Sequence, residues 1–233
     1  MLRRLIKVSA VVAGVAALCL AAAACSPVKL GAAAIVGNQR ITIAALDTEV
    51  TNLSQAAAKY PTQVNLNASQ RTQATLTWLI RYQITEELAR QQGITISAAQ
   101  GQNALNTAVK GAIASAAQQG LANATQTLIL AASGIPPDTS DELGRYEAIS
   151  DQYLTMANGG TLPASGSAAA TAAANKLNHA ECLAAKALNI QVNPQFGALD
   201  YTQYQIVDGP ATVTRAQGPV KAPSSPPATA PAC

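Results

Sequence analysis

Segments that begin with capping residues and stop at glycine constrain most strongly what this chain can fold into. Three segments open with Asn or Ser and carry Gln three residues later, which is the pattern of a capping box. These pairs are Asn67 and Gln70, Ser97 and Gln100, and Asn123 and Gln126. A glycine stands where each of the three helices should end, at Gly93, Gly120 and Gly134. The pattern predicts three successive helices.

Three further helices are predicted from caps, breaks and composition. Thr42 is placed to cap a helix over about residues 43–59, and Pro136-Pro137 precede a helix that ends near residue 157. An alanine-rich helix should cover about residues 167–188, because alanine has the highest helix propensity. Only 12% of residues are charged and 3% aromatic, so the core should be shallow and built from small side chains. We therefore expect a mainly α fold.

Short strands are predicted at both ends of the helical region. Residues 34–36 and 40–42 flank Gly37-Asn38, a two-residue hairpin signal. Residues 190–192 and 205–207 have the pattern of short strands. We expect the opening hairpin and these closing strands to form one small β element.

The first 25 residues have the layout of a bacterial lipoprotein signal. Arg3, Arg4 and Lys7 precede an apolar run and four alanines, after which comes Cys25. The apolar run is shorter than the roughly 20 residues that span a bilayer. Cys25 is the residue expected to receive lipid, although alanine stands at position 22, where such signals usually carry leucine. Ordinary cleavage near Ala24, with Cys25 left as a plain thiol, is the alternative.

These features divide the chain into four parts. Residues 1–24 are the predicted signal peptide, residues 25–32 a membrane tether, residues 33–207 a helical domain, and residues 208–233 a flexible tail rich in proline and alanine. The expected location is the outer face of the bacterial cytoplasmic membrane.

Net charge limits the partners. The formal charge of +3 comes entirely from the basic residues near the start, so the chain after the signal is neutral. A neutral chain without a basic cluster lacks the electrostatic footprint of a nucleic-acid-binding protein and is not drawn to acidic lipids. We expect no nucleic acid partner, and we expect contact with the membrane through the lipid anchor.

Two cysteines remain for a disulfide. Cys19 leaves with the signal peptide and Cys25 carries lipid, which leaves Cys182 and Cys233 outside the cytoplasm, where disulfides persist. Because Cys233 ends a proline-rich tail that needs a tether if it is to be ordered, a Cys182–Cys233 bond is the preferred pairing. Two free or mixed-disulfide thiols are the alternative.

The sequence contains no catalytic or metal-binding constellation. The one histidine, His179, lies three residues from Cys182, but zinc sites need three or four ligands, and a solvated helix face explains it better. Glu86 and Glu87 are adjacent in a predicted helix and therefore point in different directions. No Gly-x-Ser-x-Gly elbow or glycine-rich phosphate loop is present. We expect neither enzymatic activity nor a metal or other cofactor.

Two stretches, taken together, resemble a family of extracytoplasmic chaperones. Residues 34–42, Ala-Ile-Val-Gly-Asn-Gln-Arg-Ile-Thr, followed by Leu46, resemble the opening of the SurA-like periplasmic chaperone domain. Residues 192–197, Val-Asn-Pro-Gln-Phe-Gly, resemble the closing segment of actinobacterial lipoproteins of that kind. Those proteins usually carry arginine where this chain has Gln195, and an aromatic residue is common where it has Leu199. The resemblance covers about residues 33–207.

The resemblance implies a SurA N-terminal-like helical domain without the parvulin-type prolyl isomerase domain of fuller members. An isomerase domain needs roughly 90 residues, well beyond ordinary loop lengths. The connection from Asn158 to Gly166 is a short loop, and the paired histidines of parvulin sites are missing. SurA-like modules are thought to hold unfolded chains in an apolar groove without ATP.

Two functions are expected from this resemblance. The first is a lipid-anchored, chaperone-like protein that binds unfolded or exported polypeptides without ATP, through a surface that includes Trp78, Tyr82, Tyr146 and Tyr153. The second is a structural or assembly lipoprotein with one fixed envelope protein as its partner. Packing in the core or at its edge is the other explanation for aromatic residues on amphipathic helices such as Trp78 and Tyr82.

Overall fold

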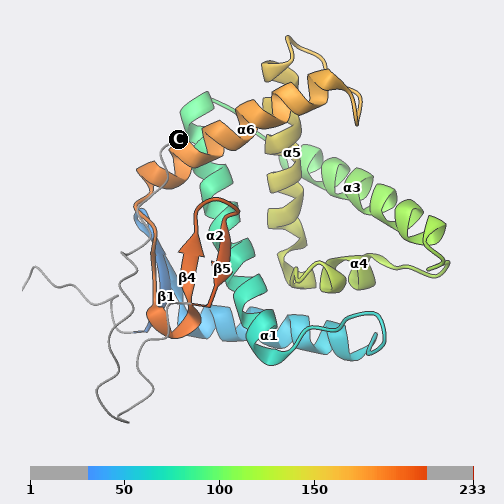
Figure 1. Cartoon of the computed structure of the whole chain (residues 1–233), viewed down its shortest axis with the longest axis vertical. Helices are drawn as coiled ribbons and strands as arrows, with labels where there is room; N and C mark the ends of the chain where they lie inside the picture. Colours follow the sequence, from blue (N-terminus) through green and yellow to red (C-terminus); the bar gives the residue numbers. More distant parts are fainter. Residues whose placement is uncertain (1–30, 209–232) are drawn as a thin grey trace, which may run out of the picture.

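The computed structural model describes residues 31–208 and Cys233, so the predicted signal peptide, Cys25 and most of the predicted tail lie outside the described residues. The described part is mainly helical, as expected (Figure 1). Its helices are α1 (Ile43–Ala58), α2 (Ala68–Gln92), α3 (Ala98–Gln118), α4 (Gln126–Ala132), α5 (Ser140–Ala157) and α6 (Ala168–Ala187). Its strands are β1 (Ala32–Val36), β2 (Gln39–Thr42), β3 (Gln191–Val192), β4 (Ala198–Asp200) and β5 (Gln205–Val207).

Side-chain caps start most helices where the sequence predicts. The Thr42 hydroxyl accepts a hydrogen bond from the backbone N–H of Ala45 at 3.0 Å, and the capping boxes at the starts of α2 and α3 both form. The predicted cap at Asn123 is wrong. Thr125 caps α4 instead and accepts from the N–H of Leu128 at 3.2 Å, because the chain becomes helical only at Gln126.

The predicted β element is in fact two separate sheets. The hairpin of β1 and β2 forms around Gly37-Asn38, and β3 pairs antiparallel with the other edge of β1. Strand β5 pairs with β4, a strand that the sequence did not predict. The chain leaves the first sheet through a 3-10 turn (Pro194–Phe196) and Gly197, whose φ is +120°. Any side chain at Gly197 would meet the Val207 carbonyl oxygen, so glycine is required there.

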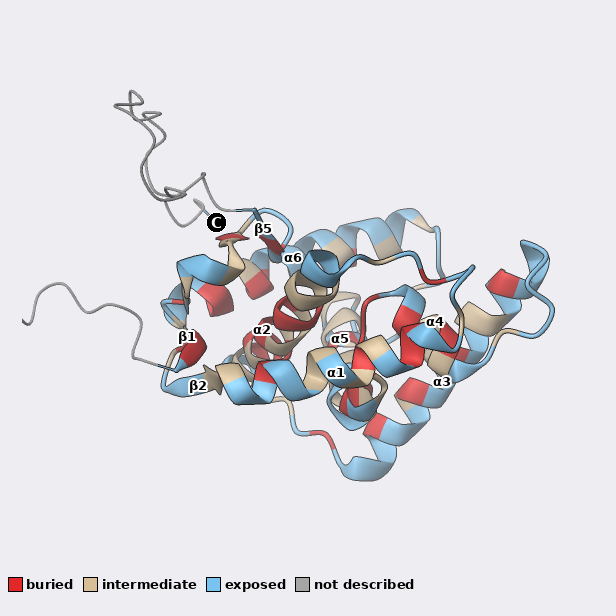
Figure 2. Ribbon diagram, turned by 90° about the horizontal axis from the view of Figure 1, so that it is seen from below, coloured by how far each residue is buried: buried red, intermediate tan, exposed pale blue. Residues whose placement is uncertain are grey.

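Helix α2 lies between two hydrophobic clusters. Leu76, Ile80 and Leu88 are fully buried and pack with the first sheet, α6 and the β4–β5 hairpin. Tyr82, on another side of α2, packs into a second cluster that α3, α4 and α5 also form. In Figure 2 the outward sides of α1 and α3 are exposed, whereas α2 is mostly buried or intermediate along its length.

Glycines allow α3 and α5 to touch. A Cβ added at Gly144 would lie 2.6 Å from the backbone oxygen of Gly101. Arg145, the next residue, joins α5 to α2 through two hydrogen bonds to the Glu86 carboxylate, at 2.7 and 2.9 Å. Its guanidinium also donates to the Ile96 carbonyl between α2 and α3 at 3.2 Å. Gln102 of α3 also donates to the Asp141 carboxylate of α5 at 2.7 Å, so close backbone contact and polar side chains together hold the crossing of α3 and α5.

The last residue of the chain is joined to α6. Cys182 and Cys233 form the predicted disulfide, with a sequence separation of 51 and an S–S distance of 2.02 Å. In the chain-entropy model, closing a loop of this size contributes about 4 kcal/mol to stability. The bond links the end of the chain to the helix that covers one end of α2.

Replacing Gly144 with alanine should lower the free energy of unfolding by about 1–3 kcal/mol, because the added methyl group would overlap the Gly101 carbonyl. The matched control is Gly111→Ala in α3, where nothing lies within 4 Å of the added Cβ. That change should raise stability by about 0.5–1 kcal/mol, since alanine is a better helix former. Urea denaturation of both variants gives the two values. Equal stability of both would contradict the close contact.

Candidate functional site

Three of the aromatic residues predicted to bind clients form one cluster between α2 and α5. The ring centroids of Trp78 and Tyr82 are 5.9 Å apart, those of Trp78 and Tyr146 5.6 Å, and those of Tyr82 and Tyr146 6.4 Å. Tyr82 is only 5% exposed, and its hydroxyl forms a 3.1 Å hydrogen bond with that of Thr139. Trp78 and Tyr146 are half-buried at the edge of the same hydrophobic cluster.

The fourth predicted residue, Tyr153, lies apart from this cluster. Its hydroxyl donates to the Lys176 carbonyl on α6 at 3.2 Å, and its ring packs against the cluster formed by α2, α6 and the first sheet. The positions of Tyr82 and Tyr153 favour the packing explanation for these two residues. Trp78 and Tyr146 are only partly buried, and the Trp78 indole N–H donates to the Ser133 carbonyl at 3.3 Å.

A buried polar cluster adjoins the aromatic residues. The Arg81 guanidinium lies 5.0 Å from the Trp78 ring centroid and 5.8 Å from that of Tyr146. Arg81, Tyr146, Glu181 and Tyr204 line one tight interior space between α2, α5, α6 and the β4–β5 hairpin. Glu181 is 7% exposed, and no described residue forms an ion pair with its carboxylate. Burial raises the pKa of Glu181, and the charge of Arg81 opposes that rise.

An open groove of about 300 Å³ lies between α3 and α5. Its floor contains Ala104 and Ala148, whose methyl side chains leave the space between the helices unfilled. Polar side chains that are exposed to solvent line its sides, and they include Gln100, Asn103, Asp151 and Gln152. The groove is therefore a hydrogen-bonding surface with an apolar floor and a single carboxylate.

A methionine extends the apolar surface next to the groove. Met156 is 48% exposed and follows Gln152 by four residues on α5. Residues four apart on a helix are neighbours on its surface. Methionine is flexible and polarizable, which suits surfaces that contact varied partners.

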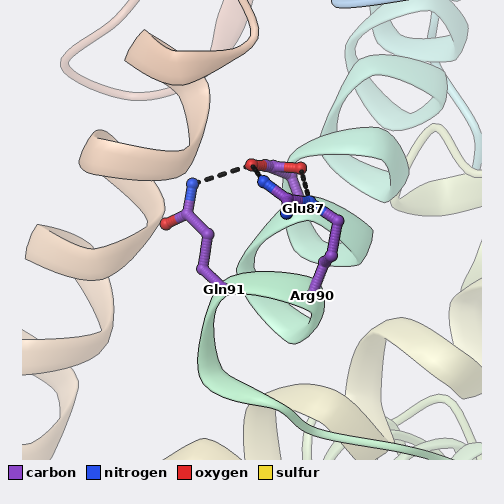
Figure 3. A network of polar contacts seen from close by, with 3 residues as sticks. All are labelled: Glu87, Arg90 and Gln91. Carbon is purple, nitrogen blue, oxygen red and sulfur yellow. Dashed lines mark hydrogen bonds and ion pairs between the residues drawn. The ribbon is translucent and has the colours of Figure 1, made fainter.

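The adjacent carboxylates of α2 have different partners, as predicted from their helical positions. Glu86 binds Arg145 of α5, whereas Glu87 accepts hydrogen bonds within its own helix from Arg90 and Gln91 (Figure 3). The Glu87 contacts, at 2.6–2.8 Å, form a surface network at the end of α2. They do not form a paired acid–base site.

Metal ligands do not gather in the described part of the chain. No three of its His, Cys, Asp and Glu residues are placed to hold an ion together. His179 is exposed on α6, and the Cys182 sulfur is bound to Cys233. None of the helices within residues 31–208 is both long enough and apolar enough to cross a bilayer.

Replacing Glu181 with glutamine should raise the Tm at pH 7 by on the order of 2–4 °C, the shift that about 1 kcal/mol gives in a chain of this size. Because the fold raises the pKa of this carboxyl, the folded state binds its proton more tightly than the unfolded chain does, and ionisation costs stability. This cost is absent well below the ordinary pKa of 4.5 and complete above the folded pKa.

The advantage of Glu181→Gln should therefore shrink as the pH falls from 7 to 4. Thermal unfolding across this pH range measures the difference in Tm between the variant and the native protein. Asp47→Asn, on the exposed side of α1, is the control. A variant that is less stable than the native protein at pH 7 would show that contact with Arg81 outweighs burial.

Comparisons with known proteins find no match for this chain among protein-family models, curated proteins or solved structures. The function is therefore inferred from the sequence, the groove and the clusters beside it.

Proposed function

We propose that this protein is a lipid-anchored, extracytoplasmic chaperone-like protein that binds unfolded or exported polypeptides without ATP. The observation that carries the proposal is the open groove between α3 and α5, with its apolar floor and amide-bearing sides. Side-chain amides carry both hydrogen-bond donors and acceptors, so they match the N–H and C=O groups of any extended backbone. Such matching depends little on client sequence.

The lining of the groove favours polypeptides over other large ligands. None of the residues that line it is Lys or Arg, so a phosphate backbone would find no counter-charge there. None is aromatic, so a base or the apolar face of a sugar ring would have no platform on which to stack. A polypeptide needs only what the groove offers, which is hydrogen bonds along a backbone and small apolar contacts.

The SurA-like assignment is part of the proposal. The two stretches that carry the resemblance lie side by side, because β1 pairs with β3. The Asn193 side chain also donates to the Ala32 carbonyl at 3.0 Å, and its backbone N–H donates to Ala33 at 2.9 Å. Asn193 therefore joins the closing segment to the opening strand. These contacts are a structural reason for an asparagine at this position of the motif.

The full-length protein, isolated from cells, should slow the aggregation of several unrelated, chemically denatured proteins when added in stoichiometric excess without ATP. Light scattering after dilution from denaturant measures this. Asn103→Trp, which places an indole in the groove, should weaken the effect at least threefold. Asn106→Trp, at an exposed position of α3 outside the groove lining, should leave it unchanged.

One result would count against this function, and another would count against the groove as its site. If the native protein fails to slow aggregation of every client tested, the alternative of one fixed envelope partner is favoured. If it does slow aggregation and Asn103→Trp behaves like Asn106→Trp, the clients bind elsewhere, and the half-buried Trp78 and Tyr146 become the next candidates.

The anchor has its own test. Cys25→Ser should abolish incorporation of a radioactive fatty acid and leave the protein unprocessed or released from the membrane, because the cysteine thiol is the lipid attachment point. Cys182→Ser, which leaves the signal unchanged, should label like the native protein. Equal labelling of the Cys25→Ser protein would rule out lipidation at this residue.

A further inference from the structure

We propose that the groove between α3 and α5 selects polypeptide segments that carry a lysine or arginine side chain, which Asp151 receives. This inference rests on the proposed polypeptide-binding function and specifies the class of client. The rest of the lining would hold the backbone of the bound segment, while the Asp151 carboxylate sets the charge preference of the groove.

Asp151 is suited to this role because of its position. It is the one charged residue among those that line the groove, and it is exposed to solvent. Within the described part of the chain, neither an ion pair nor a hydrogen bond engages its carboxylate, whereas its backbone oxygen accepts from the Thr155 hydroxyl at 2.8 Å. Although the residue is exposed, the protein atoms around its carboxyl desolvate it in part and raise its pKa, so its ionised form lacks part of the hydration that it would have in water.

A second carboxylate strengthens the negative potential at this point. Glu147 lies four residues before Asp151 on α5, and like charges at this spacing repel each other. Burial raises the pKa of Glu147, with a further contribution from the charge of Asp151. The charge of Arg81 partly offsets this rise in the pKa of Glu147. The Arg81 guanidinium itself lies over the Trp78 and Tyr146 rings. An ammonium or guanidinium group brought by a client would relieve the repulsion.

The opposite wall of the groove brings no competing charge. The α3 residues that line it are Gln100, Asn103, Ala104 and Thr107, all of them uncharged. A divalent metal would find too few ligands here, since no three potential ligands are clustered in the described residues. A cationic side chain on a flexible polypeptide therefore fits the charge, the amides and the apolar floor together.

Two dye-labelled, unstructured peptides test this inference. They are identical except for one central residue, lysine in one and glutamate in the other, and fluorescence anisotropy measures their binding to the full-length protein. The lysine peptide should bind about two- to fivefold more tightly at low salt, the range expected of a partly exposed ion pair. Asp151→Asn should remove this difference, whereas Asp47→Asn, an equal charge change on α1, should preserve it.

The results separate the inference from the function. Equal binding of both peptides to the native protein, or a preference that survives in Asp151→Asn, would overturn the charge selection even if aggregation is suppressed. Displacement of the lysine peptide by a neutral oligosaccharide would overturn it as well, because the groove would then be a glycan site. A preference lost only in Asp151→Asn would support the inference even if the protein fails to hold large unfolded clients.

Discussion

The fold depends on the burial of α2 along more than one side. Leu76, Ile80 and Leu88 pack against α6, the first sheet and the β4–β5 hairpin, while Tyr82 packs toward α3 and α5. The apolar residues of α2 therefore lie on more than one side of the helix, and threonines complete its buried surface. The Thr77 hydroxyl, for example, accepts from the backbone N–H of Ile206 in β5 at 2.8 Å. Every other helix is placed by its contact with α2 or with a neighbour of α2.

The sequence predicts local structure better than it predicts which segments meet. The caps at Asn67 and Ser97 and the hairpin at Gly37-Asn38 were predictable, because each depends on a few adjacent residues. The division into two sheets was not, since it depends on the turn at Gly197 and on contact between β5 and α2. The second buried side of α2 was not predicted for the same reason, since it depends on where α3 and α5 lie.

The candidate site was less predictable than the fold. The cluster of Trp78, Tyr82 and Tyr146 was partly foreseen, but the sequence could not show that Tyr82 is buried and bonded to Thr139. The groove was missed altogether, because its polar residues look like ordinary solvated helix faces until α3 and α5 are placed together. One signal was present: Gly101 with Ala104, and Gly144 with Ala148, put small residues on single faces of both helices.

The close contact and the groove have one physical origin. At Gly101 and Gly144 the two backbones touch, and no side chain lies between them. One turn further along each helix, Ala104 and Ala148 carry one methyl group each, and both residues line the groove. Leucine at the partly exposed Ala104 would fill part of the groove with apolar contacts, whereas Ala148 is only 7% exposed and has little room for a larger side chain. The alanine-rich composition that makes the core shallow is therefore also what leaves a polar-walled groove open at its surface.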